Sequence, residues 1–554
     1  MMRRLRGVVS CCVLAALPLT AARAAPSAGT ILQQTMPPPV APVPPRSVIT
    51  LPVPRLQHSR AQVKIPIAHI HVVGNTVLPK QVLSRFTRQV TGHTVTLGAL
   101  DSLAARITAR LHRAGYPLAY AYVPAQTIHQ GVVTIRIIEP RYDRILLRGH
   151  SRLDPAEARR TLGVAPGQRI TAGPLSRGLL LLEQTPGLRV AGTLVPGTRP
   201  ATSSLAVSLH DTPVAYASLG VNNYGAAYTG RATSTLNVGV NDPFGYGSQL
   251  AVNGLTTQEG LLHAGGFSAL SPNLYDGLRF SVYGSRVSYH LGGRFAPLDE
   301  SGQANQLGFS LRYPLILRPG TLLQASLGVL HDHFVETTAS VGTQDRSHIN
   351  LLHLAVTGAF ADGFGGVTTA GLRISRGQLV LTSADARAAD AAGPQAAGGF
   401  WVGQLTVARH QRLPARLHLG VNVSGQLASR NLDGSQQFYL GGPGGVMSYP
   451  VGEAGGDEGL LVRLRLGHRV PGVPGDLQAA VLAQAGKVWV NRDPYAGATG
   501  PDTLFRAGAG LGFTYHWTTH MSASVDYLHT VGPARAVAGP AHGGEIWASL
   551  TLSG

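Results

Sequence analysis

Two histidine pairs have the spacing that metal chemistry would need. His69 and His71 would share one face of a strand, as would His331 and His333, because side chains two residues apart point to the same side. A protein zinc site takes three or four ligands, and no third ligand is evident near either pair. We therefore expect solvated or interfacial histidines, with no metal and no other cofactor.

The sequence lacks the common catalytic motifs. It contains no G-x-S-x-G nucleophile turn and no H-E-x-x-H zinc helix. It also contains no G-x-x-x-x-G-K-[ST] phosphate loop, so no motif in it predicts ATP binding. We do not expect an enzyme.

Arginine supplies most of the positive charge. The 554-residue chain carries 46 Lys and Arg against 27 Asp and Glu, a formal net charge of +19. Four arginines fall on the polar faces of alternating segments: Arg416, Arg463, Arg465 and Arg506. A cationic pore wall or an acidic partner would explain them. A bias of composition would explain them as well, because lysine occurs only at Lys64, Lys80 and Lys487.

Residues 1–24 have the pattern of a secretory signal peptide. A basic cluster at residues 3–6 precedes an apolar stretch, and a small-residue cleavage site follows. Cleavage would remove four arginines and both cysteines, Cys11 and Cys12, leaving a net charge of +15 (19 − 4) and no thiol. An exported chain rarely meets nucleic acid, so we do not expect a nucleic-acid partner.

Residues 25–66 are rich in proline and show no apolar periodicity. This composition predicts a semi-rigid periplasmic linker in an extended conformation, outside any core. The stretch Thr30–Met36 could form a helix, but it is too short to be stable alone. The sequence leaves open whether a helix here blocks a pore.

A diverged repeat occupies residues 67–211. Segment 70–78 matches segment 145–153 at isoleucine, glycine and leucine positions, with an offset of 75 residues (149 − 74). In each copy the apolar spacing predicts a strand, two helices and two strands. We therefore expect two small α+β domains, residues 67–140 and 141–211.

From residue 212 to the end, apolar and polar residues alternate. In the segment 505–517, for example, Phe505, Leu511 and Trp517 fall on one face, and Arg506 on the other. This period of two predicts strands with one polar face, although a soluble sandwich alternates in the same way. After the N-terminal stretch no run of about 20 apolar residues occurs, so we exclude transmembrane helices.

The lengths of the connections favour a barrel over a sandwich. Short turns such as 318–320 alternate with longer connections such as 292–304, 338–348 and 430–459. Short turns on one side and long loops on the other are typical of outer-membrane barrels. We expect a mainly β protein, in which residues 212–554 form a 16-stranded transmembrane antiparallel β-barrel behind the two α+β domains.

This organisation resembles the outer-membrane transporters of two-partner secretion. These TpsB-type proteins, the ShlB/FhaC/HecB family of hemolysin secretion and activation, carry POTRA domains in front of a barrel. The resemblance covers nearly the whole mature chain, and its matches to the POTRA motif of the first domain are Gly74, Gly115, Tyr116 and Pro124. The expected α+β domains would then be POTRA domains in the periplasm.

The most specific match lies in the longest connection, 430–459, which is similar to the family's lumen-entering loop. The residues that carry it are Gly441, Gly442, Pro443, Val446, Met447, Ser448 and Tyr449. In the family an arginine at the loop tip reaches an aspartate on the barrel wall. Here Met447 stands at the arginine position and Ser448 at the next, while Gln484, followed by Gly486, stands at the wall.

Both charges of the family's ion pair are therefore absent together. Joint loss is physically reasonable, because one charge kept alone in a partly dehydrated lumen would cost several kcal/mol. We expect the loop to dock less firmly than in the family, with Met447 packed on the wall and Gln484 bonded to backbone groups.

The resemblance implies an outer-membrane transporter that recognises a secreted partner exoprotein of the TpsA type. The periplasmic POTRA domains would bind this cargo, which would cross the pore unfolded and without ATP. Strand addition is one binding mode, and segments 118–123 and 132–139 are its first candidates. Further implied partners are outer-membrane lipid, lipopolysaccharide and the barrel assembly machinery that inserts the protein.

Two alternatives remain at this stage. A POTRA-containing assembly and insertion factor for outer-membrane proteins belongs to the same superfamily, although such factors usually have more than two POTRA domains. A plain diffusion pore is the other alternative, but it would not need the repeat at residues 67–211.

Overall fold

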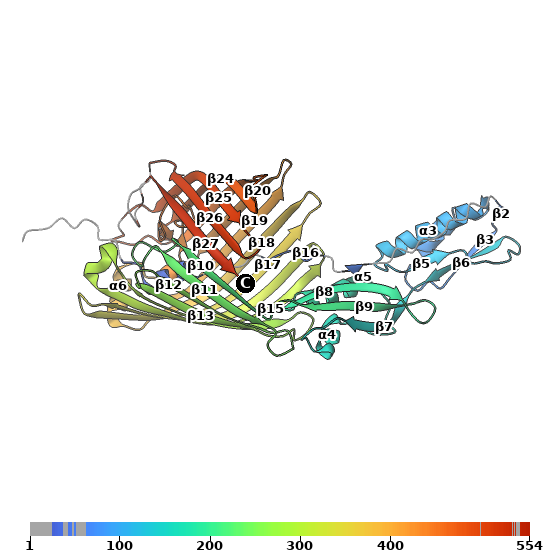
Figure 1. The fold of residues 1–554 in the computed structure, drawn as a ribbon, viewed down its shortest axis with the longest axis horizontal. Helices are drawn as coiled ribbons and strands as arrows, with labels where there is room; N and C mark the ends of the chain where they lie inside the picture. The colour runs from blue at the N-terminus through green and yellow to red at the C-terminus, as the bar shows by residue number, and fades with distance from the viewer. Residues whose placement is uncertain are drawn as a thin grey trace, which may run out of the picture.

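The computed structural model describes residues 25–36, 42–46, 49–50, 63–498, 500–533, 536, 538 and 543–554. The signal peptide expected at residues 1–24 lies outside them. A large barrel makes up one part of the molecule, and two α+β units follow one another away from one of its ends (Figure 1). We call the end beside these units the near end of the barrel and the opposite end the far end.

The first α+β unit packs two helices on a three-stranded sheet. Its elements are β2 (Lys64–Pro66), β3 (His69–Val73), α2 (Lys80–Thr87), β4 (Thr94–Thr96), α3 (Leu97–Arg113), β5 (Tyr120–Tyr122) and β6 (Val132–Ile138). The sheet order is β3-β6-β5, and β2 pairs separately with β4. The apolar positions Leu100, Leu103, Ile107 and Leu111 of α3 are fully buried, because their spacing places them on one helical face.

The second unit repeats the order strand, helix, helix, strand, strand but lacks counterparts of β2 and β4. It consists of β7 (Arg141–Arg148), α4 (Pro155–Leu162), α5 (Ala172–Glu183), β8 (Leu188–Pro196) and β9 (Thr202–Asp211). Asp154 caps α4, and Pro155 occupies its first turn, where no intrahelical N–H bond is lost. The short strand β1 (Ile49–Thr50) lies parallel to β8 and completes a sheet in the order β1-β8-β9-β7.

The repeated glycines have the same structural role in both units. Gly74 and Gly149 have φ angles of +82° and +89°, which residues with side chains rarely adopt. A Cβ at either position would also collide with a carbonyl oxygen of the unit's last strand, that of Ile137 or of Leu209. The close approach of the backbones therefore requires glycine at both sites.

Sixteen antiparallel strands close the barrel, as the alternation and the connections predicted. They are β10 (Ala215–Asn222), β11 (Thr233–Asn241), β12 (Gln249–Thr257), β13 (Leu262–Leu270), β14 (Arg279–His290), β15 (Glu300–Arg318), β16 (Thr321–Thr338), β17 (Thr343–Ala361), β18 (Gly366–Leu381), β19 (Gly398–Arg412), β20 (Leu417–Ala428), β23 (Glu458–Arg469), β24 (Asp476–Trp489), β25 (Thr503–His516), β26 (Met521–Thr530) and β27 (Gly544–Ser553). The first and last strands pair with each other, for example at Leu219 and Leu552.

Two expected loops are shorter than the sequence suggested. Residues 338–348 are mostly strand, because β16 and β17 stay paired up to Thr338 and Thr343. The 292–304 connection likewise ends at Glu300, and residues 293–298 within it form a 3₁₀ helix. At the far ends of the long strands, beyond the apolar band, the residues are polar and so resemble a loop in the sequence. The backbone nevertheless continues the hydrogen-bonded pairing of the strands there.

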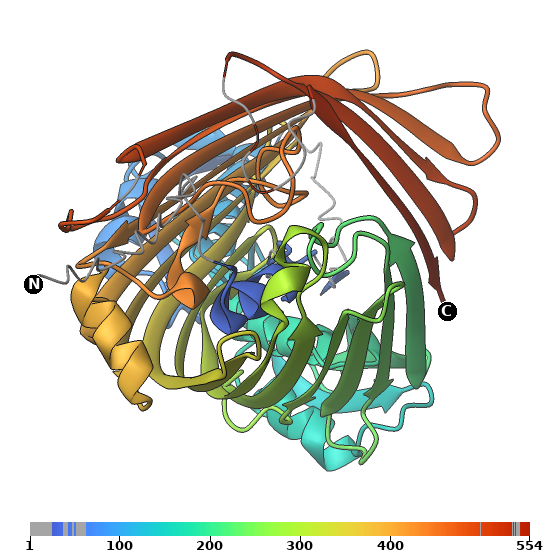
Figure 2. The ribbon, with the colours of Figure 1, turned by 90° about the vertical axis from the view of Figure 1, so that its left-hand side faces the viewer.

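The interpretation of residues 25–66 as a linker outside any core is wrong for its first part. Helix α1 (Ala28–Thr35) lies inside the ring of strands, where Figure 2 shows it in dark blue. Ile31 and Leu32 are 1% and 3% exposed and belong to a buried cluster with Phe334 and Phe400 of the wall. Among the described residues, no helix is long and apolar enough to cross a membrane.

Candidate functional site

The connection between β20 and β23, residues 429–457, turns into the barrel lumen and fills part of it (Figure 2). Strands β21 (Phe438–Tyr439) and β22 (Gly455–Gly456) pair at its base. At its tip a bridge joins Gly441 to Val446, and the Gly442 N–H donates to the Tyr449 carbonyl at 3.0 Å. Val446 and Tyr449 are fully buried, so the tip is packed and is not a solvated excursion.

Three hydrogen bonds join Met447 and Ser448 of the tip to the wall. The Met447 N–H donates to Gln484 Oε1 at 2.6 Å, and Trp547 Nε1 donates to the Met447 carbonyl at 2.5 Å. Ser448 Oγ donates to the Ala507 carbonyl at 3.3 Å. Gln484 thus bonds the loop backbone, as the sequence suggested for an amide in place of the acid.

Small wall residues make room for this contact. A Cβ at Gly486 would lie 2.5 Å from Leu440 Cδ2, and the side chain of Ser448 already fills the place of a Cβ at Gly508. Met447 is 9% exposed and packs in a cluster that includes Leu482 and Trp547. Glycines on the lumen face therefore shape a seat for the loop.

A buried ion pair provides a further anchor, which the sequence reasoning missed. Arg506 of β25 donates to Glu453 Oε1 of the loop from Nε at 2.8 Å and from a terminal nitrogen at 2.5 Å. The Arg506 and Glu453 side chains are 5% and 0% exposed. Glu453 Oε2 also accepts from the Ala538 N–H at 2.7 Å, and the Tyr449 ring lies 5.2 Å from Arg506 Cζ.

The polarity of this pair is opposite to the one expected from the resemblance. Here the acid comes from the loop and the arginine from the wall. Arg506 faces the lumen as expected, but its guanidinium is buried between wall and loop and therefore adds no charge to a solvated pore wall. An ion pair can anchor a lumen loop whichever partner the loop supplies, the acid or the arginine, provided that both partners are present.

The other three arginines lie in three different settings. Arg463 donates to the Pro443 carbonyl of the loop at 3.2 Å. Arg465 pairs across the lumen face with Asp526 at 3.4 Å. Arg416 has a φ of +60° in the turn between β19 and β20, so the structure places it at the near end and not on the wall.

Helix α1 is joined by polar contacts to a wall strand at one end and to the β10–β11 connection at the other. The Ala28 N–H, one of the unpaired donors of the first turn, donates to Glu336 Oε1 at 2.7 Å. At the other end, Tyr228 donates its hydroxyl hydrogen to Gln34 Oε1 at 2.8 Å.

The same helix also contacts the lumen loop. Thr30 Oγ1 lies 3.0 Å from the Tyr439 hydroxyl, and Gln33 Nε2 donates to the Gln437 carbonyl at 2.6 Å. Because α1 bridges loop and wall, movement of the loop requires either movement of α1 or the loss of these two bonds.

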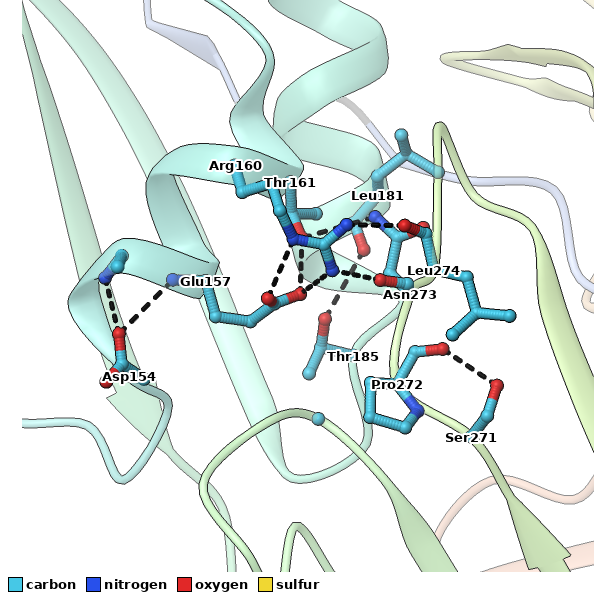
Figure 3. Close-up of polar contacts among 12 residues, drawn as sticks. Asp154, Glu157, Arg160, Thr161, Leu181, Thr185, Ser271, Pro272, Asn273 and Leu274 are labelled. Atoms are coloured by element: carbon cyan, nitrogen blue, oxygen red, sulfur yellow. Dashed lines mark hydrogen bonds and ion pairs between the residues drawn. The ribbon is translucent and has the colours of Figure 1, made fainter.

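The second α+β unit is docked on the near end of the barrel. Figure 3 shows Arg160 of α4 beside the β13–β14 connection, where it binds the carbonyls of Asn273 and Leu274 and the carboxylate of Glu157. A buried cluster continues the interface, and it includes Leu181 of α5 and Leu317 of the barrel.

A bidentate ion pair extends this interface. Arg177 donates to both carboxylate oxygens of Asp276, at 2.7 and 2.9 Å, and to the Pro314 carbonyl at 3.1 Å. Hydrogen bonding by Arg177 lowers the pKa of the Asp276 carboxyl, since it favours the ionised form. The ionised form of Asp276 therefore contributes to the docking of this unit.

The residues matched in the first α+β unit lie at structural positions. Gly115 ends α3 with a φ of +91°, and its carbonyl accepts from the Ala172 N–H of the second unit at 2.9 Å. Tyr116 packs against the core of its own unit. The Pro124 carbonyl accepts from Gln126 Nε2 at 3.2 Å.

The residues missed from the sequence are Glu453, Trp547 and those of α1. A glutamate in a polar loop carries no signal of its own, and the partner of Trp547 is 100 residues away. The described part of the chain contains no group of three or more side chains that could hold a metal ion.

Comparison with protein families gives two matches. Residues 65–140 match the POTRA domain of ShlB type, and residues 201–515 match the haemolysin secretion/activation protein ShlB/FhaC/HecB. The second match covers more than half of the chain.

Individual proteins agree with these matches. The heme/hemopexin transporter protein HuxB of Haemophilus influenzae strain 86-028NP is 26% identical over 418 residues, 74% of each chain. The outer membrane transporter CdiB of Dickeya dadantii is 22% identical over 64% of this chain and 63% of its own.

Solved structures extend the likeness to the fold. CdiB from Escherichia coli superposes with a TM-score of 0.72 at 18% identity, over 91% of this chain and 93% of its own. BamA from Haemophilus ducreyi lacking POTRA domains 1-3 superposes with a TM-score of 0.51 at 14% identity, over 89% of this chain and 100% of its own. At these identities the likeness is one of fold alone.

Proposed function

Because the chain belongs to the haemolysin secretion/activation family ShlB/FhaC/HecB, we propose that it exports one large partner protein of the TpsA type through its barrel. It is an outer-membrane protein of a transporter family, and its POTRA units lie in the periplasm. The near end of the barrel is thus the periplasmic end and the far end the extracellular one. The cargo would enter at the former and leave at the latter.

The blocked lumen is the observation that supports this proposal most directly. The loop 429–457 and helix α1 occupy the pore, yet polar contacts and side-chain packing hold them there without a covalent bond. A plain diffusion pore has no use for such an obstruction. A protein that must pass one unfolded chain and otherwise stay closed requires an obstruction that can be displaced.

The first segments considered for cargo binding are poorly placed for strand addition. Strand β6 is the central strand of its sheet. On the part of β6 that β5 does not pair with, the side-chain amide of Gln126 already bonds both the N–H and the carbonyl of Thr134. On β5, the Ala121 N–H already donates to Thr108 of α3 at 2.9 Å. An added strand would have to displace these groups.

Strand β3 has the better edge. It lies at the end of the β3-β6-β5 sheet, and its other side carries no strand among the described residues. The His69 N–H points to β6, since it donates to the Gly131 carbonyl, so the N–H of Val72 points to the open edge. We infer that an extended cargo segment pairs with β3 by strand addition.

The parallel pairing of β1 with β8 supports this mode of binding. The segment Ile49–Thr50 pairs with β8, the edge strand of the second POTRA unit, which is the unit next to the barrel. Strand β8 is the counterpart of β5 and not of β3, so this pairing shows only that an edge of a POTRA sheet in this chain can accept an extended segment.

Transport needs no nucleotide in this proposal. The sequence contains no phosphate-binding loop, and folding of the cargo outside the cell would make the passage effectively one-way. No enzymatic step is required of the transporter.

Secretion of the partner tests the proposal. A large signal-bearing exoprotein encoded beside this chain should appear in the medium when both are expressed and should remain in the periplasm without it. Arrival of the partner in the medium when the chain is deleted would refute the transporter function.

Val72→Pro tests the binding edge. It should reduce secretion several-fold by removing one outward N–H, whereas Val72→Ala, which keeps the N–H, should not. Proline is tolerated on an edge strand where its nitrogen faces outward, so the unit should still fold. Equal secretion by the two variants would exclude strand addition at β3.

The alternative, an assembly and insertion factor, has no observation of its own in its favour. The likeness to BamA is one of fold at 14% identity. Folding of other barrels in cells that lack this chain would separate the two functions, since only an assembly factor would be needed for it.

A further inference from the structure

A groove of about 780 Å³ runs along the outward face of the barrel wall between β14 and β18. Its lower part, toward the periplasmic end, is apolar. Leu307, Phe309, Val329 and Leu352 point outward there and are between 38% and 57% exposed. Exposed apolar side chains on a barrel in this position face the acyl chains of the membrane.

The upper part of the groove is polar. Its lining includes His331, Asn350, Arg376 and Gln378, each of which follows the apolar residues toward the extracellular end of its strand. His331 Nδ1 and Asn350 Oδ1 are hydrogen-bonded at 2.7 Å. The Arg376 guanidinium lies 5.5 Å from the ring centre of Trp401 on the next strand, which holds it beside the groove.

The height of this polar part can be worked out from the strands. On β16 the first outward residue at the periplasmic end is Thr321, and His331 follows ten residues later. Ten residues at about 3.3 Å, on a strand tilted by about 40°, rise roughly 25 Å. That is the height of the apolar band of an outer-membrane barrel, so His331 and Arg376 lie at the outer interface of the membrane.

The charge at this interface has one sign. Arg286 and Arg346 join Arg376 as outward cations on neighbouring strands. No Asp or Glu occupies an outward position on β14 to β18, all of whose residues the structure describes. The acidic side chains of these strands, such as the buried Asp332, lie on the lumen face. The charged side chains on the outward face of β14 to β18 are therefore all cationic.

We propose that this groove binds a phosphorylated, multiply acylated glycolipid of the outer leaflet. The acyl chains lie on the apolar lower part, and a phosphate group accepts hydrogen bonds from Arg376, with Gln378 and the His331–Asn350 pair beside it. A charged guanidinium donating to phosphate gives a stronger bond than a neutral pair. His331 would then be one of the interfacial histidines expected from the sequence.

Native mass spectrometry of the full-length chain in detergent tests the site. The probe is bisphosphorylated lipid A, compared with the same lipid without phosphates and with phosphatidylglycerol, a phospholipid of the inner leaflet. We expect the bisphosphorylated lipid to be retained most tightly, in one copy. Arg376→Gln should weaken its apparent Kd roughly tenfold, the loss expected for one charge-assisted bond.

Lys487→Gln is the matched control. Lys487 also points outward and lies 4.9 Å from the ring centre of Trp489, but it does not line the groove. Each variant is first shown to be folded by its heat-dependent migration on gels, and Arg376→Lys should recover part of the affinity. Equal weakening by Arg376→Gln and Lys487→Gln, or retention of the phosphate-free lipid or phosphatidylglycerol as tightly as lipid A, would overturn the proposal.

Discussion

Neutralising Glu453 should release the lumen loop from the wall. The variant Glu453→Gln leaves the Arg506 guanidinium, only 5% exposed, without the carboxylate that it contacts at 2.5 and 2.8 Å. Removing one partner of a buried ion pair costs about 3–5 kcal/mol. The glutamine amide can still accept one bond, so we expect about 3 kcal/mol, or roughly a hundredfold shift toward the undocked loop.

Single-channel recording in planar lipid bilayers measures this shift. We expect the variant to spend a much larger fraction of time in high-conductance states than the unmodified protein. The double variant Glu453→Arg with Arg506→Glu should restore long closed periods, because it re-forms the pair with the polarity usual in the family, arginine on the loop and acid on the wall.

Arg465→Gln provides the control for a change of lumen charge. Arg465 pairs with Asp526, and both belong to the wall, so its loss changes the charge without touching the loop. If Glu453→Gln leaves the recordings unchanged, or if Arg465→Gln alters them equally, the ion pair does not anchor the loop.

Two further predictions concern α1 and the docked POTRA unit. Deleting residues 28–35 should raise the mean conductance but leave the barrel folded, because the strands close without the helix. Bilayer recording measures the conductance, and heat-dependent migration on gels shows whether the barrel is folded. An unchanged conductance would show that α1 does not obstruct the pore. The contact between Arg177 and Asp276 should be acid-sensitive. Because the pKa of Asp276 is lowered in the folded protein, its contribution is complete above the unfolded value, about 4, and is lost as the pH falls below that value through the folded pKa. The protection factors of the amides in the β13–β14 connection, which compare exchange with the intrinsic rate at each pH, should therefore fall in acid. Arg177→Ala should show the same low protection at neutral pH; protection that stays high in Arg177→Ala would contradict this role.

The local pattern of residues determined most of the architecture. Alternation with a period of two reports which face of each strand is polar, and it requires no knowledge of neighbouring strands. Alternation and connection lengths together predicted the 16 strands, and the repeated glycines at positions 74 and 149 marked the two α+β units. The loop motif around Met447 and the amide at Gln484 were also recognisable, because each stands in a short stretch of characteristic sequence.

The tertiary structure alone decided how the lumen is closed. Glu453 and Arg506 are 53 residues apart, and nothing local in either stretch reveals that a loop folded into the pore brings them together. Helix α1 is too short to persist alone, and it depends on burial of Ile31 and Leu32 against the wall and on contacts with the loop. Likewise, only the order of strands in the sheet shows that β3, and not β6, has an open edge. Contacts between distant segments depend on the path of the backbone in space, which residue spacing does not encode.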